Sequence, residues 1–237
     1  MQKIYFIAFI LLLIFGRVEV TSAQADTGTY LKEIKAELQK QWPKNRTINL
    51  VFHGHSVPCG YARTPLVKTF DSYPFLLLKQ LKSLYPYAVI NVIITSIGGE
   101  NSVQGQKRFK RDVLIHKPDV LFIDYALNDR SVGLKKSKVA MEKMRKKALR
   151  KNIKIILLTP SNDLTVDFNK PGNQLEQFSN QLISLAKKYN IGLSDSYGAF
   201  RDLARSGEDL KSYMAQSNHP NELGHEVITN ELIKWFK

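Results

Sequence analysis

The sequence predicts an α/β protein in which a parallel sheet is covered by helices on both faces. Three observations support this class. Five short apolar runs rich in β-branched residues recur along the chain, amphipathic helical patterns separate them, and each run ends in turn-forming or polar residues. Continuous apolar runs are typical of strands covered on both faces, and strand–helix alternation is typical of parallel sheets.

The elements follow one another without an internal repeat or a low-complexity linker. The predicted strands are residues 48–54, 88–96, 119–127, 154–160 and 191–197. The predicted helices are residues 30–41, 72–85, 104–116, 134–151, 173–189 and 221–236. Right-handed crossovers are expected between the parallel strands. The length fits one domain with a sizeable core, which we expect over residues 26–237.

The N-terminal segment is predicted to be a signal peptide. Lys3 precedes an unbroken apolar run at residues 4–15, and small and polar residues follow up to Ala25. This run is shorter than the ~20 residues that a membrane-spanning helix needs. We therefore expect residues 1–25 to be removed on export to the periplasm or the exterior. An uncleaved signal that anchors the protein in the membrane is the alternative.

The chain is strongly basic, with a formal net charge of +14, and much of this charge lies in one predicted helix. Residues 135–154 contain ten Lys or Arg and one Glu, and the apolar Met141, Met144 and Ala148 share one side of that helix. A solvated outer face explains the pattern. Attraction of residues 135–151 to an anionic polysaccharide or a membrane surface is the alternative. No nucleic-acid partner is expected, because no recognition motif is present.

Polar residues that follow the predicted strands are the candidates for chemistry, because ligands of an open parallel sheet bind beyond the carboxyl ends of its strands. Hydrolytic acyl transfer needs a nucleophile, a base and donors for an oxyanion. Ser56 leaves the first strand at a glycine-flanked turn. Gly99 presents an unhindered backbone N–H after the second strand, and Asn128 presents an amide after the third. His219 lies in the loop before the last helix.

Serine, glycine, asparagine and histidine in this chain order resemble the SGNH (GDSL-type) hydrolase superfamily. The matching blocks are GHS (54–56), IGGENS (97–102), ALND (126–129) and NHPNELGH (218–225), and the resemblance spans about residues 49–235. It implies a flavodoxin-like three-layer α/β/α sandwich with five parallel strands in the order 2-1-3-4-5. It also implies an esterase, lipase or carbohydrate deacetylase that needs no metal or other cofactor.

The resemblance assigns roles to these residues. Ser56 would be the nucleophile and His219 the general base. The N–H groups of Ser56 and Gly99 would form the oxyanion hole together with the side chain of Asn128.

The chain departs from the family pattern in three blocks. His55 replaces the aspartate of the usual Gly-Asp-Ser, Ala126 replaces a glycine, and Gln216 stands where the family usually carries an aspartate three residues before the histidine. In Ser–His–Asp sites, replacing this carboxylate by an amide costs about 10⁴ in kcat, because the imidazole takes the wrong tautomer. We therefore predict that His219 is oriented in another way.

Three arrangements would orient His219. A backbone carbonyl that accepts the Nδ1 proton would give a Ser–His dyad. The amide oxygen of Gln216 would accept the same proton without a charge. Another carboxylate would complete a substituted triad, and Asp195 is the first candidate for it, followed by Asp129.

Other polar residues near Ser56 have simpler interpretations. His53 and His55 share a strand face and would need a third histidine to bind zinc, and five strands are too few for the barrels that use such pairs. We predict no metal site, and expect His55 to line the pocket. Glu100 and Asn101, at the crevice mouth, are expected to touch substrate. Cys59, the only cysteine, is expected to pack as a small hydrophobe and excludes an intrachain disulfide.

The sequence thus predicts an exported serine esterase that hydrolyses O-acyl esters, above all O-acetyl esters on carbohydrate, through an acyl-enzyme. Export and the polar strand ends favour a glycan ester, and no long apolar lid indicates a lipid chain. Two alternatives stay open. One is a non-catalytic protein that binds an acylated glycan, which Gln216 favours; the other is an O-acyltransferase that uses the same residues.

Overall fold

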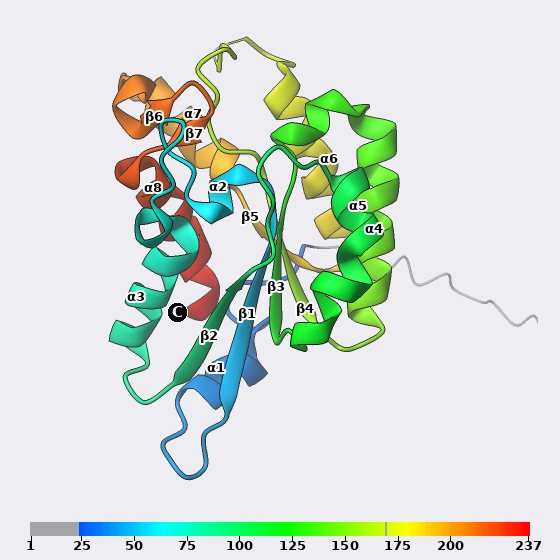
Figure 1. Ribbon diagram of the computed structural model, residues 1–237, viewed down its shortest axis with the longest axis vertical. Coiled ribbons are helices and arrows are strands. Elements are labelled where there is room, and N and C mark those ends of the chain that lie inside the picture. Colours follow the sequence, from blue (N-terminus) through cyan, green and yellow to red (C-terminus); the bar gives the residue numbers. More distant parts are fainter. Residues whose placement is uncertain (1–23, 169) are drawn as a thin grey trace, which may run out of the picture.

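The computed structural model describes residues 24–168 and 170–237 and shows a three-layer α/β/α sandwich (Figure 1). Residues 1–23 of the predicted signal peptide lie outside the described residues. Among the described residues, no helix has both the length and the hydrophobicity that a membrane crossing requires.

The central layer is a parallel sheet with strand order β2-β1-β3-β4-β5. Its strands are β1 (Thr47–Gly54), β2 (Val89–Ile94), β3 (Val120–Asp124), β4 (Lys154–Leu158) and β5 (Gly192–Ser194). All side chains of β3 are buried, as its continuous apolar run predicts. The fold class and the strand order implied by the family resemblance are confirmed.

Helices cover both faces of the sheet (Figure 1). One face carries α1 (Lys32–Leu38), α3 (Tyr73–Leu84), α7 (Ser196–Arg205) and α8 (Glu222–Leu232), and the other carries α4 (Ser102–Asp112), α5 (Gly133–Leu149) and α6 (Gln174–Tyr189). The short helices are α2 (Ser56–Cys59), η1 (Thr69–Asp71), η2 (Leu114–His116), η3 (Asn128–Ser131), η4 (Leu210–Tyr213) and η5 (Ile233–Phe236).

Two hydrophobic cores result from this layering, because successive side chains of a strand point to opposite faces. In β1, Leu50 and Phe52 join the core under α3 and α8. Val51, between them, joins the core under α4, α5 and α6. The strands whose ends carry the candidate residues are therefore held from both sides.

Two predictions about single elements are wrong. The fifth strand was predicted over residues 191–197, but β5 ends at Ser194. The next residue, Asp195, caps helix α7, which was not predicted: its carboxylate accepts the N–H of Gly198 at 3.1 Å. The second strand was expected to be buried on both faces, but β2 lies at the sheet edge and Val89 keeps 47% of its surface exposed.

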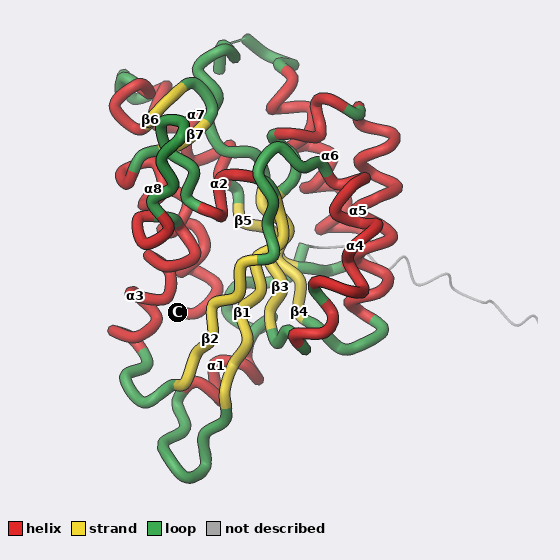
Figure 2. Tube along the Cα trace, viewed as in Figure 1, coloured by secondary structure: helices red, strands yellow, loops and turns green. Residues whose placement is uncertain are grey.

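A small antiparallel hairpin lies beyond the carboxyl ends of the sheet strands. Its strands are β6 (Met214–Gln216) and β7 (His219–Pro220), and they pair Gln216 with His219. The sequence indicated only a loop in this region. Figure 1 shows the hairpin close to α2, and Figure 2 shows that loops which follow the strands gather at the same end of the sheet.

Candidate active site

Ser56 is the first residue of α2, directly after β1. The Nδ1 atom of His55 accepts the N–H of Val57 at 3.3 Å, so this histidine caps the short helix as an aspartate would. Gly60 ends α2 with φ +85°, and a Cβ there would lie 2.5 Å from the carbonyl oxygen of Lys68. The tight turn thus fixes Ser56 at the sheet end. Its N–H lies in the first turn of a helix, where no intrahelical acceptor exists.

The hairpin brings His219 to Ser56 although the two are 163 residues apart. His219 Nε2 lies 2.9 Å from Ser56 Oγ. Only 7% of the surface of Ser56 and 8% of that of His219 are exposed, so the pair is largely shielded from bulk water. A hydroxyl and an imidazole at this distance satisfy the geometric requirement for a nucleophile and its base.

The other ring nitrogen of His219 meets two groups. Its Nδ1 lies 2.9 Å from the carbonyl oxygen of Ala62 and 2.8 Å from Gln216 Nε2. The amide of Gln216 is held by Thr64, whose backbone N–H and hydroxyl donate to Oε1 at 3.1 and 3.3 Å. The structure therefore presents the amide nitrogen, and not the expected amide oxygen, to His219. Of the three expected arrangements, only the backbone carbonyl provides an acceptor for the Nδ1 proton.

These two neighbours favour opposite tautomers of His219. With the proton on Nδ1, the ring donates to Ala62 and leaves Nε2 free to accept the proton of Ser56. With the proton on Nε2, the ring accepts from Gln216 and points an N–H at Ser56. Only the first tautomer can act as a base, and the amide nitrogen of Gln216 competes with it.

The pKa of His219 lies below its ordinary value of 6.5, chiefly because burial disfavours the charged ring. The hydrogen bond to Ala62 acts in the opposite direction, and the nearby His55 lowers the pKa further. In the described part of the chain, His219 forms no ion pair with a carboxylate. The ring is therefore neutral near pH 7, which is the form that a general base needs.

The predictions that Asp195 or Asp129 orients His219 are wrong. Asp195 caps α7 and accepts the hydroxyl of Thr159 at 2.8 Å. Asp129 accepts the N–H of Ser102 at 2.7 Å and the hydroxyl of Ser137 at 2.5 Å, which ties α4 to α5. Both carboxylates are thus used to join elements of the fold.

Hydrogen bonds connect the segments that carry the expected oxyanion donors. Gly99 occupies the third position of a turn that the N–H of Glu100 closes on the carbonyl of Ile97 at 3.2 Å, and its φ of +78° requires glycine. The N–H of Ile97 donates to the carbonyl of Gly54 at 3.1 Å, next to the Ser56 turn. Asn128 Nδ2 donates to the carbonyl of Glu100 at 3.0 Å, and its amide carries a second N–H for a ligand.

Glu100 and Asn101 were expected to touch substrate, but their side chains have structural partners. Glu100 is buried, and its carboxylate accepts Arg108 Nε at 2.7 Å and the hydroxyl of Tyr125 at 2.7 Å. Asn101 caps α4: its side-chain oxygen accepts the N–H of Gln104 at 3.2 Å, and the side-chain oxygen of Gln104 accepts the N–H of Asn101 at 3.0 Å. This reciprocal cap fixes the loop that carries Gly99.

His55 was expected to line the pocket, but it lies under the turn that carries Ser56, and only 1% of its surface is exposed. Its Nε2 lies 3.3 Å from a carboxylate oxygen of Asp124, which also accepts the hydroxyl of Tyr73 at 3.0 Å. Among the described residues, no three His, Cys, Asp or Glu side chains gather where they could hold a metal ion.

The side chain of His53 is buried, and that of Cys59 is partly buried, close to the turn that carries Ser56. His53 Nδ1 lies 3.0 Å from the hydroxyl of Thr95, and burial lowers the pKa of the ring to about 4. Burial also raises the pKa of the Cys59 thiol to about 11, so it is not a nucleophile at neutral pH.

Three neighbours of the pair were missed by the sequence analysis. The Tyr61 ring lies 5.9 Å from the His219 ring and packs against Gly98, where a Cβ would come within 3.0 Å of it. Tyr61 was detectable as an aromatic residue five positions after Ser56. Ala62 contacts His219 through its backbone carbonyl, and Thr64 contacts Gln216. Neither contact could be recognised from the sequence.

Comparisons with known proteins show the family and the fold. The GDSL-like Lipase/Acylhydrolase family matches residues 52–227. No curated protein matched the chain. A solved two-domain esterase (CEX) active on acetylated mannans is similar, with a TM-score of 0.72 and 19% identity. The match covers 91% of this chain and 54% of that one, so the chain spans about half its length.

A second similar structure is Axe2, an acetylxylan esterase from Geobacillus stearothermophilus. Its TM-score is 0.69 at 21% identity, and the match covers 80% of this chain and 94% of Axe2. At these identities, the likeness to both esterases shows a shared fold.

Proposed function

The chain belongs to the GDSL-like lipase/acylhydrolase family, and on this basis we propose that it is a serine esterase that removes O-acetyl groups from carbohydrate. One observation carries the proposal: His219 Nε2 lies 2.9 Å from Ser56 Oγ at the carboxyl end of β1. A serine hydroxyl within hydrogen-bond reach of a neutral imidazole is the arrangement that nucleophilic acyl transfer requires.

In the proposed acylation step, Ser56 Oγ attacks the ester carbonyl carbon while His219 Nε2 takes the hydroxyl proton. The oxyanion accepts hydrogen bonds from the N–H groups of Ser56 and Gly99 and from Asn128 Nδ2. The bond between the carbonyl carbon and the sugar oxygen then breaks, and His219 returns its proton to that oxygen. The sugar leaves with a free hydroxyl, and the acetyl group stays on Ser56.

Deacylation repeats these steps with water. His219 Nε2 takes a proton from a water molecule whose oxygen attacks the acetyl carbon. The bond between the acetyl carbon and Ser56 Oγ breaks, the proton on His219 passes to Ser56 Oγ, and acetic acid leaves and ionises in water. Throughout both steps, the Ala62 carbonyl keeps the proton of Nδ1 in place, so the proposed machinery is a Ser–His dyad with a backbone acceptor.

The acetyl group and the carbohydrate are the finer parts of the proposal. Both solved relatives are described as acting on acetylated polysaccharides, and the first was also crystallised with mannopentaose. The ring of Tyr61 packs against Gly98 and lies 5.9 Å from the ring of His219. The described activities of the two solved esterases therefore support a short acyl group on a polar alcohol.

Ser56→Ala tests the function. We expect kcat on p-nitrophenyl acetate and on acetylated xylo- or manno-oligosaccharides to fall by about 10⁴-fold or more. Cys59→Ala is the matched control in the same turn and should leave both rates near wild type. A serine-reactive phosphonate should label the wild type but not Ser56→Ala; equal labelling of the two would refute the assignment of the nucleophile.

The non-catalytic alternative keeps one observation in its favour, because the amide nitrogen of Gln216 supports the tautomer that cannot act as a base. If the wild type and Ser56→Ala hydrolyse the esters equally slowly while both bind the acetylated glycan, the protein is a binding protein. An O-acyltransferase would instead transfer the acetyl group to an added sugar acceptor faster than to water.

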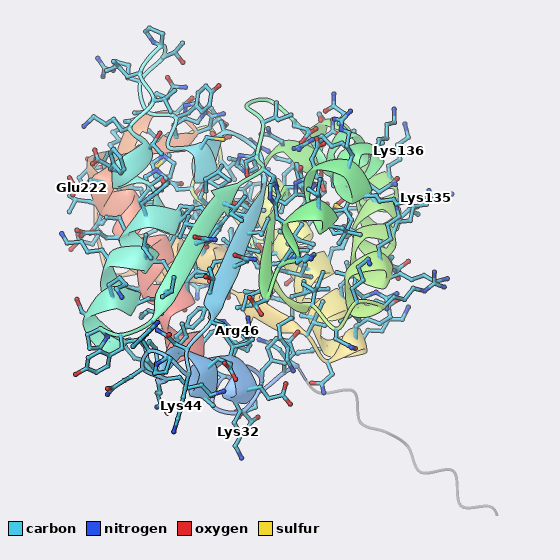
Figure 3. The ribbon with its side chains drawn as sticks, turned by 60° about the horizontal axis from the view of Figure 1, so that its bottom comes forward. Lys32, Lys44, Arg46, Lys135, Lys136 and Glu222 are labelled. Carbon is cyan, nitrogen blue, oxygen red and sulfur yellow. The ribbon has the colours of Figure 1, made fainter. Side chains whose placement is uncertain are left out.

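We also propose export of the protein and contact of α5 with an anionic polysaccharide. Figure 3 shows Lys135 and Lys136 pointing outward, in a different region of the surface from Lys32, Lys44 and Arg46. Replacing Lys135 and Lys136 by Glu should weaken retention on immobilised polygalacturonate, whereas the same charge change at Lys32 and Lys44 should not. Retention on anionic lipid vesicles alone would point to a membrane surface.

The proposed export is tested by determining the N-terminus of the mature protein. A mature N-terminus near Asp26 would support export.

A further inference from the structure

A cavity of about 210 Å³ adjoins the candidate active site. One wall is the segment over residues 60–68, and the opposite wall comes from the β6–β7 hairpin and the first turn of α8. Two of its lining residues also hold the proposed base. The carbonyl of Ala62 accepts the Nδ1 proton of His219, and Pro220 follows His219 in β7. The cavity therefore adjoins the groups around His219 Nδ1, although Ser56 and His219 do not line it themselves.

The charges around the cavity balance. Arg63 and Lys68 supply two cations, and Asp71 and Glu222 supply two anions. Lys68 Nζ lies 3.3 Å from an Asp71 oxygen, and Glu222 projects from the start of α8 (Figure 3). The two cations would attract a phosphate or carboxylate ligand, but the two anions would repel it to a similar extent. The rim instead offers donors and acceptors to an uncharged polar ligand.

One of the residues that line the cavity is a buried histidine whose tautomer is fixed by a hydrogen bond. His225, which is only 2% exposed, lines the cavity, and its Nδ1 accepts the N–H of Tyr73 at 3.2 Å. An accepting Nδ1 leaves the proton of the neutral ring on Nε2. Burial lowers the pKa of His225 to about 3, so the ring stays neutral at the pH of the reaction. Within the described residues, its Nε2 has no hydrogen-bond partner.

Apolar surface completes the lining. Ala62, Leu66, Ala215 and Pro220 contribute it, and it lies beside the polar groups of the rim. A sugar ring has the same mixture, with C–H groups on its faces and hydroxyls around its edge. The volume is below the range of about 300–1,000 Å³ that drug-sized ligands occupy, so there is room for one ring and not for a chain.

We propose that this cavity is a subsite for one neutral sugar unit of the substrate, next to the unit whose ester reaches Ser56. This inference rests on the proposed function, because it takes the alcohol of the ester to be a carbohydrate. The subsite would let binding of a non-reacting sugar position the ester at Ser56. An acetylated oligosaccharide should therefore be a better substrate than a small ester that leaves the cavity empty.

Leu66→Trp tests the subsite, because Leu66 is 58% exposed and a larger side chain there can fill the cavity without entering the core. The ratio of kcat/KM for an acetylated oligosaccharide to kcat/KM for p-nitrophenyl acetate should fall by about tenfold, mainly through KM. Leu223→Trp is the matched control, since Leu223 is 51% exposed in the neighbouring turn of α8 and does not line the cavity. This control should keep the wild-type ratio.

Product inhibition gives an independent measurement. The deacetylated oligosaccharide should inhibit hydrolysis of p-nitrophenyl acetate by the wild type and by Leu223→Trp, and Leu66→Trp should weaken that inhibition by about tenfold. An unchanged substrate ratio and unchanged inhibition in Leu66→Trp would overturn the subsite. If the wild type releases no acetate from the oligosaccharide but the inhibition still depends on Leu66, the proposed function fails and the sugar-binding cavity stands.

Discussion

At the scale of single residues, the nature of the atom that faces His219 Nδ1 sets how well Ser56 can react. The acceptor is the neutral carbonyl of Ala62, at 2.9 Å. A carboxylate in this place would stabilise the imidazolium of the transition state with a full charge, whereas a carbonyl offers only a dipole. The amide nitrogen of Gln216 places a donor, and not an acceptor, beside the same ring nitrogen. The present arrangement therefore orients His219 but stabilises its charged form weakly.

Gln216→Glu should raise kcat, on the order of tenfold or more. One carboxylate oxygen can accept the two donors of Thr64, as Oε1 of Gln216 does, and the other can accept the Nδ1 proton of His219. The added charge should also raise the pKa of His219 from its lowered value. Because the neutral ring is the base, the acid limb of the profile of kcat/KM against pH should move to higher pH. Both changes are measured with p-nitrophenyl acetate.

Two controls separate orientation by Ala62 from orientation by Gln216. Gln216→Ala removes the competing donor and should keep kcat within about tenfold of wild type. Asp195→Asn should also stay within this range, because Asp195 caps α7. A fall of about a hundredfold or more in Gln216→Ala would show that the amide, and not the carbonyl, orients the base.

The candidate residues were predictable to different degrees for physical reasons. Ser56, Gly99, Asn128 and His219 could be proposed from the sequence because the proposed chemistry requires particular side chains, or the absence of one, at strand ends. The orienting group could not, because any residue supplies a backbone carbonyl, and Ala62 gives no sign of its role.

At the scale of elements, the loop between β2 and α4 carries Gly99, and a buried polar network holds it. Arg108 on α4 pairs with Glu100 in this loop, and the hydroxyl of Tyr125 donates to the same carboxylate. Tyr125 also lies 3.2 Å from His53 Nε2, on β1. The network therefore joins α4 to β1 and to the residue that follows β3, next to the loop that carries Gly99.

Arg108→Met should destabilise the fold by about 3–5 kcal/mol, because it leaves the buried Glu100 carboxylate without its cation. The Arg108 side chain is 10% exposed and that of Glu100 is 8% exposed. Arg111→Met, on the same helix, is the control: Arg111 is 79% exposed, so its solvent-screened pair with Asp112 should contribute little to stability. Urea unfolding measures both, and equal losses would contradict a buried ion pair that holds the loop.

The length of an element and its separation from the preceding one decided whether the sequence could predict it. Long helices and buried strands were found because their apolar spacing repeats over several turns or residues. The hairpin of β6 and β7 was missed because strands of three and two residues are too short to show a period. Helix α7 was missed because its first residues, Ser196 and Tyr197, are separated from β5 only by Asp195 and were assigned to that strand.

At the scale of the whole molecule, stability depends on histidines that the fold keeps neutral. Burial lowers the pKa of His53 to about 4 and that of His225 to about 3, from an ordinary value of 6.5. In the unfolded chain, both would bind a proton near pH 6.5. The unfolded state thus binds more protons than the folded state at mildly acid pH, which favours unfolding there. Asp129 acts in the opposite sense, because burial raises its pKa.

The free energy of unfolding should therefore fall as the pH drops from about 6.5, and each histidine should remove on the order of 2 kcal/mol by about pH 5. The loss should continue until the pH reaches the lowered pKa values of the folded state. Urea titrations at a series of pH values measure this slope. His53→Gln and His225→Gln should each reduce the slope by about one proton, whatever they do to stability at pH 7, because each removes one group that titrates only on unfolding. A wild-type stability that does not change between pH 6.5 and 5 would contradict the argument. A slope that neither variant changes would contradict it too, since the extra protons of the unfolded state would then bind elsewhere.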